Sequence, residues 1–122
     1  MNTGNATNGY VIVTTTVDNA EAARKLAAEI VDAQLAACVQ RMPIQSTYRW
    51  QGKVETAAEF LLQAKTRAGL AEALIAFIQS RHTYETPELV VTPILDGEAT
   101  YLAWIDAETV SAAGEARDEV EA

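Results

Sequence analysis

Two consecutive extended segments of unusual length constrain the fold of this 122-residue chain most. The first spans residues 36–50 and contains Pro43, which indicates a bulge or a position in an edge strand. The second ends near Thr66, and the pair Gln51-Gly52 between the two segments is typical of a tight turn. Strands usually have about five or six residues, so the sequence predicts a hairpin that extends beyond its own domain. The exposed edge of such a hairpin needs a partner.

Shorter segments of alternating periodicity surround this hairpin. Residues 10–17 are nearly all β-branched, which is typical of a central buried strand. Asp18, with Glu21 three residues later, indicates the start of a helix with an alanine-rich apolar stripe. A second helix, a further strand and a terminal strand or short helix follow, at about residues 69–81, 88–95 and 101–105. The order β-α-β-β-α-β predicts an α+β, ferredoxin-like fold with two helices on one face of an antiparallel sheet.

Length, charge and cysteine content indicate the domain organisation, the excluded partners and the expected location of this chain. The length fits one domain, which we expect at residues 10–110, with a flexible leader at 1–9 and a flexible acidic tail at 111–122. The formal net charge of −8 argues against nucleic acid and anionic membrane surfaces as partners. A single cysteine, and a first segment without the pattern of a signal peptide, predict a cytoplasmic protein.

The apolar core that this sequence offers is small. Alanine accounts for 23 of the residues, and two helices would leave the second face of the sheet uncovered. Burial of further surface against other copies of the chain would compensate for both features. The sequence therefore predicts an oligomer, and Tyr48, Trp50 and Trp104 are expected to be core residues or interface anchors.

The residues that could carry chemistry gather in the connector at 82–88, which reads HTYETPE. It holds His82, the only histidine, Tyr84 and two glutamates, a set that could coordinate a divalent cation or act in general acid–base chemistry. Alternatively, His82 caps the preceding helix and the glutamates are solvated. Cys38 is either a small buried hydrophobe or a soft-metal ligand. Because no nucleotide-binding loop, nucleophile elbow or spaced cysteine pair accompanies these residues, we do not expect an enzyme.

Five sequence blocks occur in the same order as in one known family. They are LAACV at 35–39, STYRWQGK at 46–53, Glu59 with Lys65-Thr66, HTYETPE at 82–88 and YLAWI at 101–105. In this combination the chain resembles the CutA divalent-cation tolerance family. The resemblance implies a ferredoxin-like fold, a tight homotrimer in which long hairpins extend the sheets of neighbouring subunits, and copper binding connected with tolerance to divalent metals.

Two functional hypotheses follow. The first is a non-enzymatic homotrimer that binds copper or other divalent cations, without nucleic-acid or membrane partners, and its predicted ligands are His82, Cys38, Glu85 and Glu88. The second is a regulatory or scaffold trimer that binds a small effector or a partner protein in clefts between subunits. The predicted cleft residues are Trp50, Lys65, Tyr84 and Glu88.

Overall fold

The computed structural model describes residues 9–110, so the predicted tail at 111–122 and all but the last residue of the predicted leader at 1–9 lie outside the described residues. Within that range four strands form one antiparallel sheet in the order β2-β3-β1-β4. The elements are β1 (Tyr10–Val17), α2 (Ala20–Asp32), β2 (Cys38–Trp50), β3 (Lys53–Arg67), the 3-10 turn η1 (Ala68–Leu70), α3 (Ala71–Arg81), β4 (Val90–Ile94) and α4 (Ala99–Ala107). The predicted α+β fold and its β-α-β-β-α-β order are confirmed.

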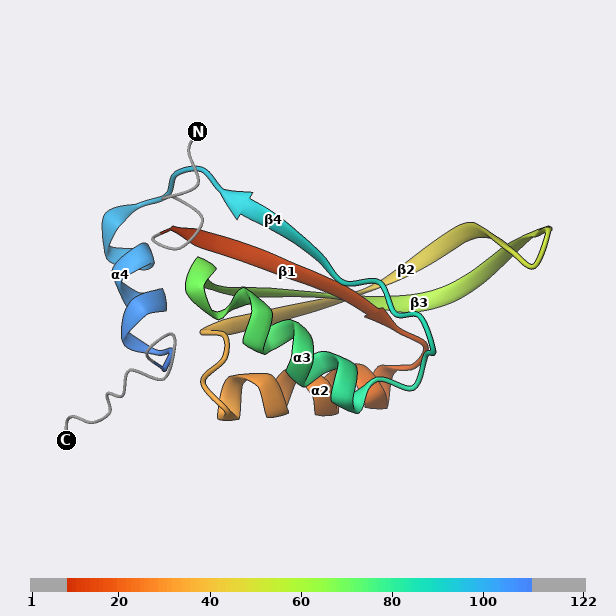
Figure 1. The fold of residues 1–122 in the computed structure, drawn as a ribbon, viewed down its shortest axis with the longest axis horizontal. Helices are drawn as coiled ribbons and strands as arrows, with labels where there is room; N and C mark the ends of the chain where they lie inside the picture. Colours follow the sequence, from red (N-terminus) through yellow and green to blue (C-terminus); the bar gives the residue numbers. More distant parts are fainter. Residues whose placement is uncertain (1–8, 111–122) are drawn as a thin grey trace.

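The sheet has one face that α2 and α3 cover (Figure 1). Side chains of β1 alternate between the two faces, and Val11 and Val13 are buried beneath the helices. Opposite them on β3, Thr66 and Ala64 are buried as well. The core of this face is completed by Leu26, Ile30, Leu62, Leu74 and Ile78. The other face is more open, since Met42 on β2 and Val90 on β4 are 45% and 50% exposed.

Helix α2 begins one residue later than the sequence predicted. Its N-cap is Asn19 rather than Asp18, because the Asn19 side chain accepts a hydrogen bond from the Ala22 N–H at 2.8 Å. Asn19 also donates to the Asp18 carboxylate at 2.8 Å, so both residues contribute to the cap. The predicted alanine-rich stripe is confirmed by the buried residues Ala23, Leu26, Ala27 and Ile30.

Strands β2 and β3 form a ribbon that is longer than the rest of the sheet. Their pairing runs without a bulge to the last pair, Trp50 with Lys53, so Pro43 lies in an edge strand and not at a bulge. Gln51 and Gly52 connect the strands with φ angles of 51° and 79°, both in the left-handed region, as a two-residue type I′ turn requires. Strand β1 ends opposite Phe60, and the ribbon continues beyond it (Figure 1).

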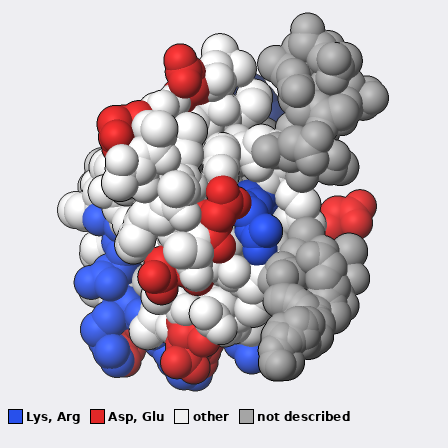
Figure 2. All heavy atoms as spheres, turned by 90° about the vertical axis from the view of Figure 1, so that its left-hand side faces the viewer, with Lys and Arg blue, Asp and Glu red and all other residues white. Residues whose placement is uncertain are grey.

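The predicted element at 101–105 is a helix, α4. The side chain of Glu98 caps it by accepting a hydrogen bond from the Tyr101 N–H at 2.9 Å. Ile105 anchors the helix and is fully buried. On the end of the molecule that carries α4, acidic and basic side chains both occur, with uncharged surface between them (Figures 1 and 2). Strand β4 is shorter than the predicted 88–95, because residues 88 and 89 precede it and Leu95 follows it.

Candidate functional site

The connector between α3 and β4 is held in place by the imidazole ring of His82. The Nε2–H of this ring donates to the backbone carbonyl of Thr16 at 2.7 Å, and Nδ1 accepts from the Tyr84 N–H at 3.0 Å. A backbone N–H can only donate and a carbonyl can only accept, so these two contacts place the proton on Nε2. The ring is therefore a neutral imidazole with both nitrogens hydrogen-bonded.

The end of the β1–β4 ladder explains why the ring turns toward β1. The ladder stops where Val90 pairs with Thr14, and Thr16 lies beyond this last pair. His82 follows directly after α3, where it is the C-cap residue, as one alternative predicted. Among the described contacts its ring bonds to β1 and to the Tyr84 backbone rather than to the carbonyls of α3. Beyond the last β1–β4 pair, a hydrogen bond from the imidazole thus takes the place of a bond from the β4 backbone.

A second bond ties the connector to the ribbon. The Tyr84 hydroxyl donates to the Glu59 carboxylate at 2.7 Å, and the Tyr84 and His82 rings lie 4.7 Å apart between centroids. Burial, followed by this bond and the charge of Glu59, raises the pKa of the Tyr84 phenol above its ordinary value of 10.0. Tyr84 is therefore a neutral hydrogen-bond donor at physiological pH.

One subunit does not bring the four predicted metal ligands together. Cys38 is half-buried at the start of β2, opposite Lys65, whereas the His82 ring bonds to the carbonyl of Thr16, which pairs with Leu61. These two sheet positions are four residues apart along β3, or about 13 Å at roughly 3.3 Å per residue. Both connector glutamates are exposed. Between residues 9 and 110, no three His, Cys, Asp or Glu side chains form a group that could hold a metal ion.

The donors present in one subunit therefore do not fit a copper centre. His82 offers no free nitrogen lone pair, and the thiol and the two carboxylates have no common focus among the described residues. Their assignment as metal ligands stays a prediction.

The four predicted cleft residues also lie at separate places in one subunit. Trp50 is at the tip of the ribbon, paired with Lys53, and is 51% exposed. Lys65 is twelve residues further along β3, about 40 Å away at roughly 3.3 Å per residue, and its ammonium lies 5.9 Å from the centroid of the Tyr101 ring. Tyr84 is bonded to the ribbon and Glu88 is exposed. Only neighbouring subunits could bring such residues into one cleft, so this cleft stays a prediction.

Apolar side chains that the sequence suggested as core or interface anchors are exposed in the subunit. Tyr48, Trp50 and Trp104 are 43%, 51% and 40% exposed, so they are not core residues of one subunit. Sequence reasoning did not single out Leu95, which is 80% exposed just after β4. The largely apolar run LVVTPIL at 89–95, which only Thr92 interrupts, was the available signal. None of the described helices is both long and apolar enough to cross a membrane.

Comparison with known families agrees with this architecture. The family model described as CutA1 divalent ion tolerance protein matches residues 11–108, from the first strand to the residue that follows α4. The chain belongs to this family. The CutA resemblance proposed from five sequence blocks is thus confirmed, and the match includes the whole connector at 82–88 and the ribbon.

Named CutA relatives are similar over most of this chain. It is 42% identical over 110 residues to the rice protein named "Protein CutA 1, chloroplastic", covering 89% of this chain and 62% of the rice protein. It is 44% identical to the chloroplastic CutA of Arabidopsis thaliana, but spans only 55% of that protein. A divalent-cation tolerance protein CutA of Yersinia pestis is 41% identical over 82% of this chain and 84% of its own length.

Solved CutA structures have the same fold. The crystal structure of CutA1 from Oryza sativa superposes with a TM-score of 0.84 at 42% identity, covering 88% of this chain and 99% of that one. CutA1 from Thermus thermophilus gives a TM-score of 0.80 at 38% identity, covering 83% and 99%. CutA from Xylella fastidiosa gives 0.81 at 35% identity, covering 84% and 100%. The CutA1 fold is therefore present in nearly its full extent.

Proposed function

We propose that this chain takes part in tolerance to divalent cations as a homotrimer that catalyses no reaction. The observation that carries the proposal is the CutA1 family match over residues 11–108, with solved CutA structures of the same fold. Family membership supports a role in divalent metal tolerance, and relatives are named for it. The cations are the cargo of this role, and copper is the first candidate.

The trimer is supported by surfaces that one subunit leaves open. β2 and β4 are the two edge strands of the sheet, and exposed strand edges are normally paired or protected. Trp50 on β2 and Val90 on β4 are 51% and 50% exposed. Joining the edge of one subunit to another subunit in a closed ring would cover both edges at once.

Cation binding in this proposal takes donors from more than one subunit. The reason is the absence of any three-donor group among the described residues of a single subunit. Cys38 is the donor best suited to Cu(I), because copper in this state prefers soft thiolate ligands. It is half-buried near one end of the more open face of the sheet.

Calorimetric titration with Cu(I) and Cu(II) tests the proposal in a non-chelating buffer. We expect Cys38→Ser to weaken Cu(I) binding at least tenfold, and a variant that no longer trimerises to lose tight binding. His82→Asn, which keeps a donor and an acceptor but removes the imidazole, tests the predicted histidine ligand. Wild-type binding no tighter than millimolar, or tight binding that persists in the monomer, would contradict the proposed intersubunit site.

The effector-binding trimer stays the alternative prediction, since its four predicted cleft residues do not lie together within residues 9–110. Location in the cytoplasm is likewise a proposal. The names of relatives differ on this point, since two plant proteins are named chloroplastic and the Archaeoglobus fulgidus structure is described as periplasmic.

A further inference from the structure

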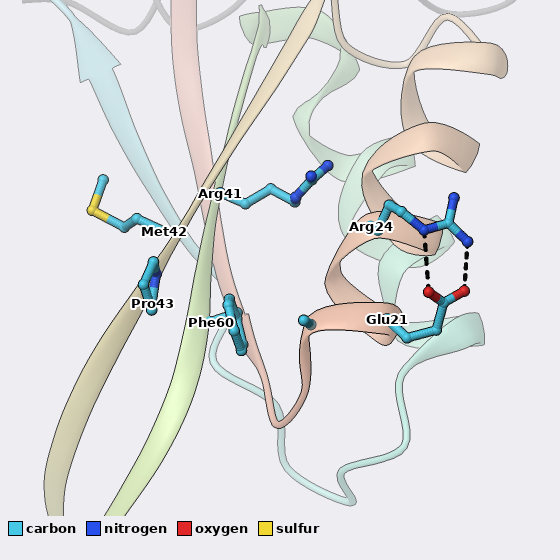
Figure 3. A pocket seen from close by; sticks show the side chains of 7 residues that line it. Glu21, Arg24, Arg41, Met42, Pro43 and Phe60 are labelled. Atoms are coloured by element: carbon cyan, nitrogen blue, oxygen red, sulfur yellow. Dashed lines mark hydrogen bonds and ion pairs between the residues drawn. The ribbon is translucent and has the colours of Figure 1, made fainter.

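A hollow of about 350 Å³ lies between the first turn of α2 and the ribbon (Figure 3). The residues that line it are Ala20, Glu21, Arg24, Arg41, Met42, Pro43 and Phe60. It occurs where β1 ends opposite Phe60 while β2 and β3 continue. Beyond this point the ribbon extends past α2, which covers the sheet up to there (Figure 1). The lining includes no predicted metal ligand and no predicted cleft residue.

Among the charged groups that line this hollow, one positive charge, that of Arg41, has no carboxylate partner among the described residues. The Glu21 carboxylate accepts two hydrogen bonds from Arg24, so these two charges compensate each other. The same bonds lower the pKa of Glu21 and keep it ionised at neutral pH. Arg41 forms no ion pair with any carboxylate of residues 9–110. In Figure 3 its guanidinium extends from β2 toward α2.

The other walls of the hollow are apolar. Phe60 on β3 and Pro43, its pairing partner on β2, both line the hollow (Figure 3). Both residues belong to the face of the ribbon that continues the helix-covered side of the sheet. The lining of the hollow thus combines the exposed guanidinium of Arg41 with an aromatic ring and a proline, which suits a ligand that has one anionic end and one apolar end.

We propose that this hollow binds a small organic carboxylate with an apolar body. The planar guanidinium of Arg41 can form two parallel hydrogen bonds to a carboxylate, while Phe60 and Pro43 contact the apolar part. A hollow of about 350 Å³ is near the lower end of the range for ligand sites, roughly 300–1,000 Å³, which suits a single ring or a short chain. This role is independent of cation tolerance and uses none of its proposed donors.

The test is an NMR titration of the full ¹⁵N-labelled chain with benzoate, which has the proposed chemistry. Benzamide is the matched neutral probe, and inorganic phosphate supplies charge without an apolar body. We expect benzoate to shift the amide signals of residues 20–24, 41–43 and 60 with a millimolar Kd. Benzamide and phosphate should each bind at least tenfold more weakly.

A pair of variants separates the site from general charge attraction. Arg41→Gln should weaken benzoate binding at least fivefold. Arg49→Gln removes the same charge from the same face of β2, eight residues nearer the tip and outside the hollow, and should leave binding unchanged. Equal losses in both variants, equal binding of benzamide or of phosphate, or no shifts at 20 mM benzoate would each overturn the proposal.

Discussion

At the scale of single residues, His82 joins backbone groups from two distant parts of the chain. Its ring receives the Tyr84 N–H and donates to the carbonyl of Thr16, 66 residues away. Only the neutral tautomer with its proton on Nε2 makes both bonds. A metal ion that binds either nitrogen must displace one of them, so cation binding at this residue competes with the local fold.

We expect His82→Ala to lower the free energy of unfolding by about 1–3 kcal/mol, the cost of leaving part-buried backbone groups without partners. Urea denaturation of the purified variant measures this change. Thr83→Ala is the matched control, because Thr83 is exposed and adjacent, and it should change stability by no more than about 0.5 kcal/mol. Equal stabilities of the two variants would contradict a structural role for the imidazole.

At the scale of elements, the turn at the ribbon tip depends on backbone conformation alone. Gly52 has a φ of 79°, and no heavy atom lies within 4 Å of an added Cβ. Gly52→Ala should therefore destabilise the protein by about 1 kcal/mol through the left-handed conformation and not through a clash. Gln51→Asn should act in the opposite direction, because asparagine accepts positive φ more readily than glutamine. Thermal denaturation checks both signs, and a Gly52→Ala variant as stable as wild type would be inconsistent with the type I′ turn.

The bond between the connector and the ribbon predicts a dependence on alkaline pH. Burial and Glu59 raise the pKa of Tyr84 above its value of 10.0 in the unfolded chain. The folded state then holds this proton to higher pH than the unfolded state, so the contribution is complete below about pH 10 and is lost as pH rises above it. Tyr10, whose pKa is raised by its hydrogen bond to Asp106, acts with the same sign.

Tyr84→Phe should thus remove part of the loss of stability above about pH 10, measured by urea unfolding at several pH values. Tyr10→Phe should remove a separate part, since Tyr10 bonds to Asp106 on α4 rather than to the ribbon. A Tyr84→Phe variant with the same pH slope as wild type would show that the phenol titrates equally in both states.

Local patterns predicted the elements better than the contacts between them. The β-branched run at residues 10–17 predicted the central strand β1, because β-branched side chains pack well on a pleated sheet. The cap of α2 was misplaced by one residue, since Asp18 and Asn19 are both good cap formers. The bond from His82 to Thr16 has no local signal, because it depends on where β4 stops pairing. The hollow beside α2 is equally non-local.

At the scale of the whole molecule, the proposed trimer depends on the two edge strands of the sheet. We expect sedimentation equilibrium to give the mass of a trimer at micromolar concentration, and Val90→Lys to shift it toward the monomer, since lysine on an edge strand opposes pairing. The control is Val31→Lys, the same substitution at a valine of α2 that is 41% exposed, which should leave the mass unchanged. A wild-type monomer, or equal effects of the two lysines, would contradict the proposed trimer.

The unbroken pairing of β2 with β3 also has a mechanical consequence. Seven residues of β3, from Lys53 to Glu59, extend past the end of β1, which makes a lever of about 23 Å at roughly 3.3 Å per residue. A tilt of about 5° of the ribbon at Glu59 would move its tip by about 2 Å, which is similar to the rise per residue in an α-helix. The Tyr84–Glu59 bond acts on the first residue of this lever. The connector is thus bonded to the base of the ribbon, while Trp50 lies at its opposite end.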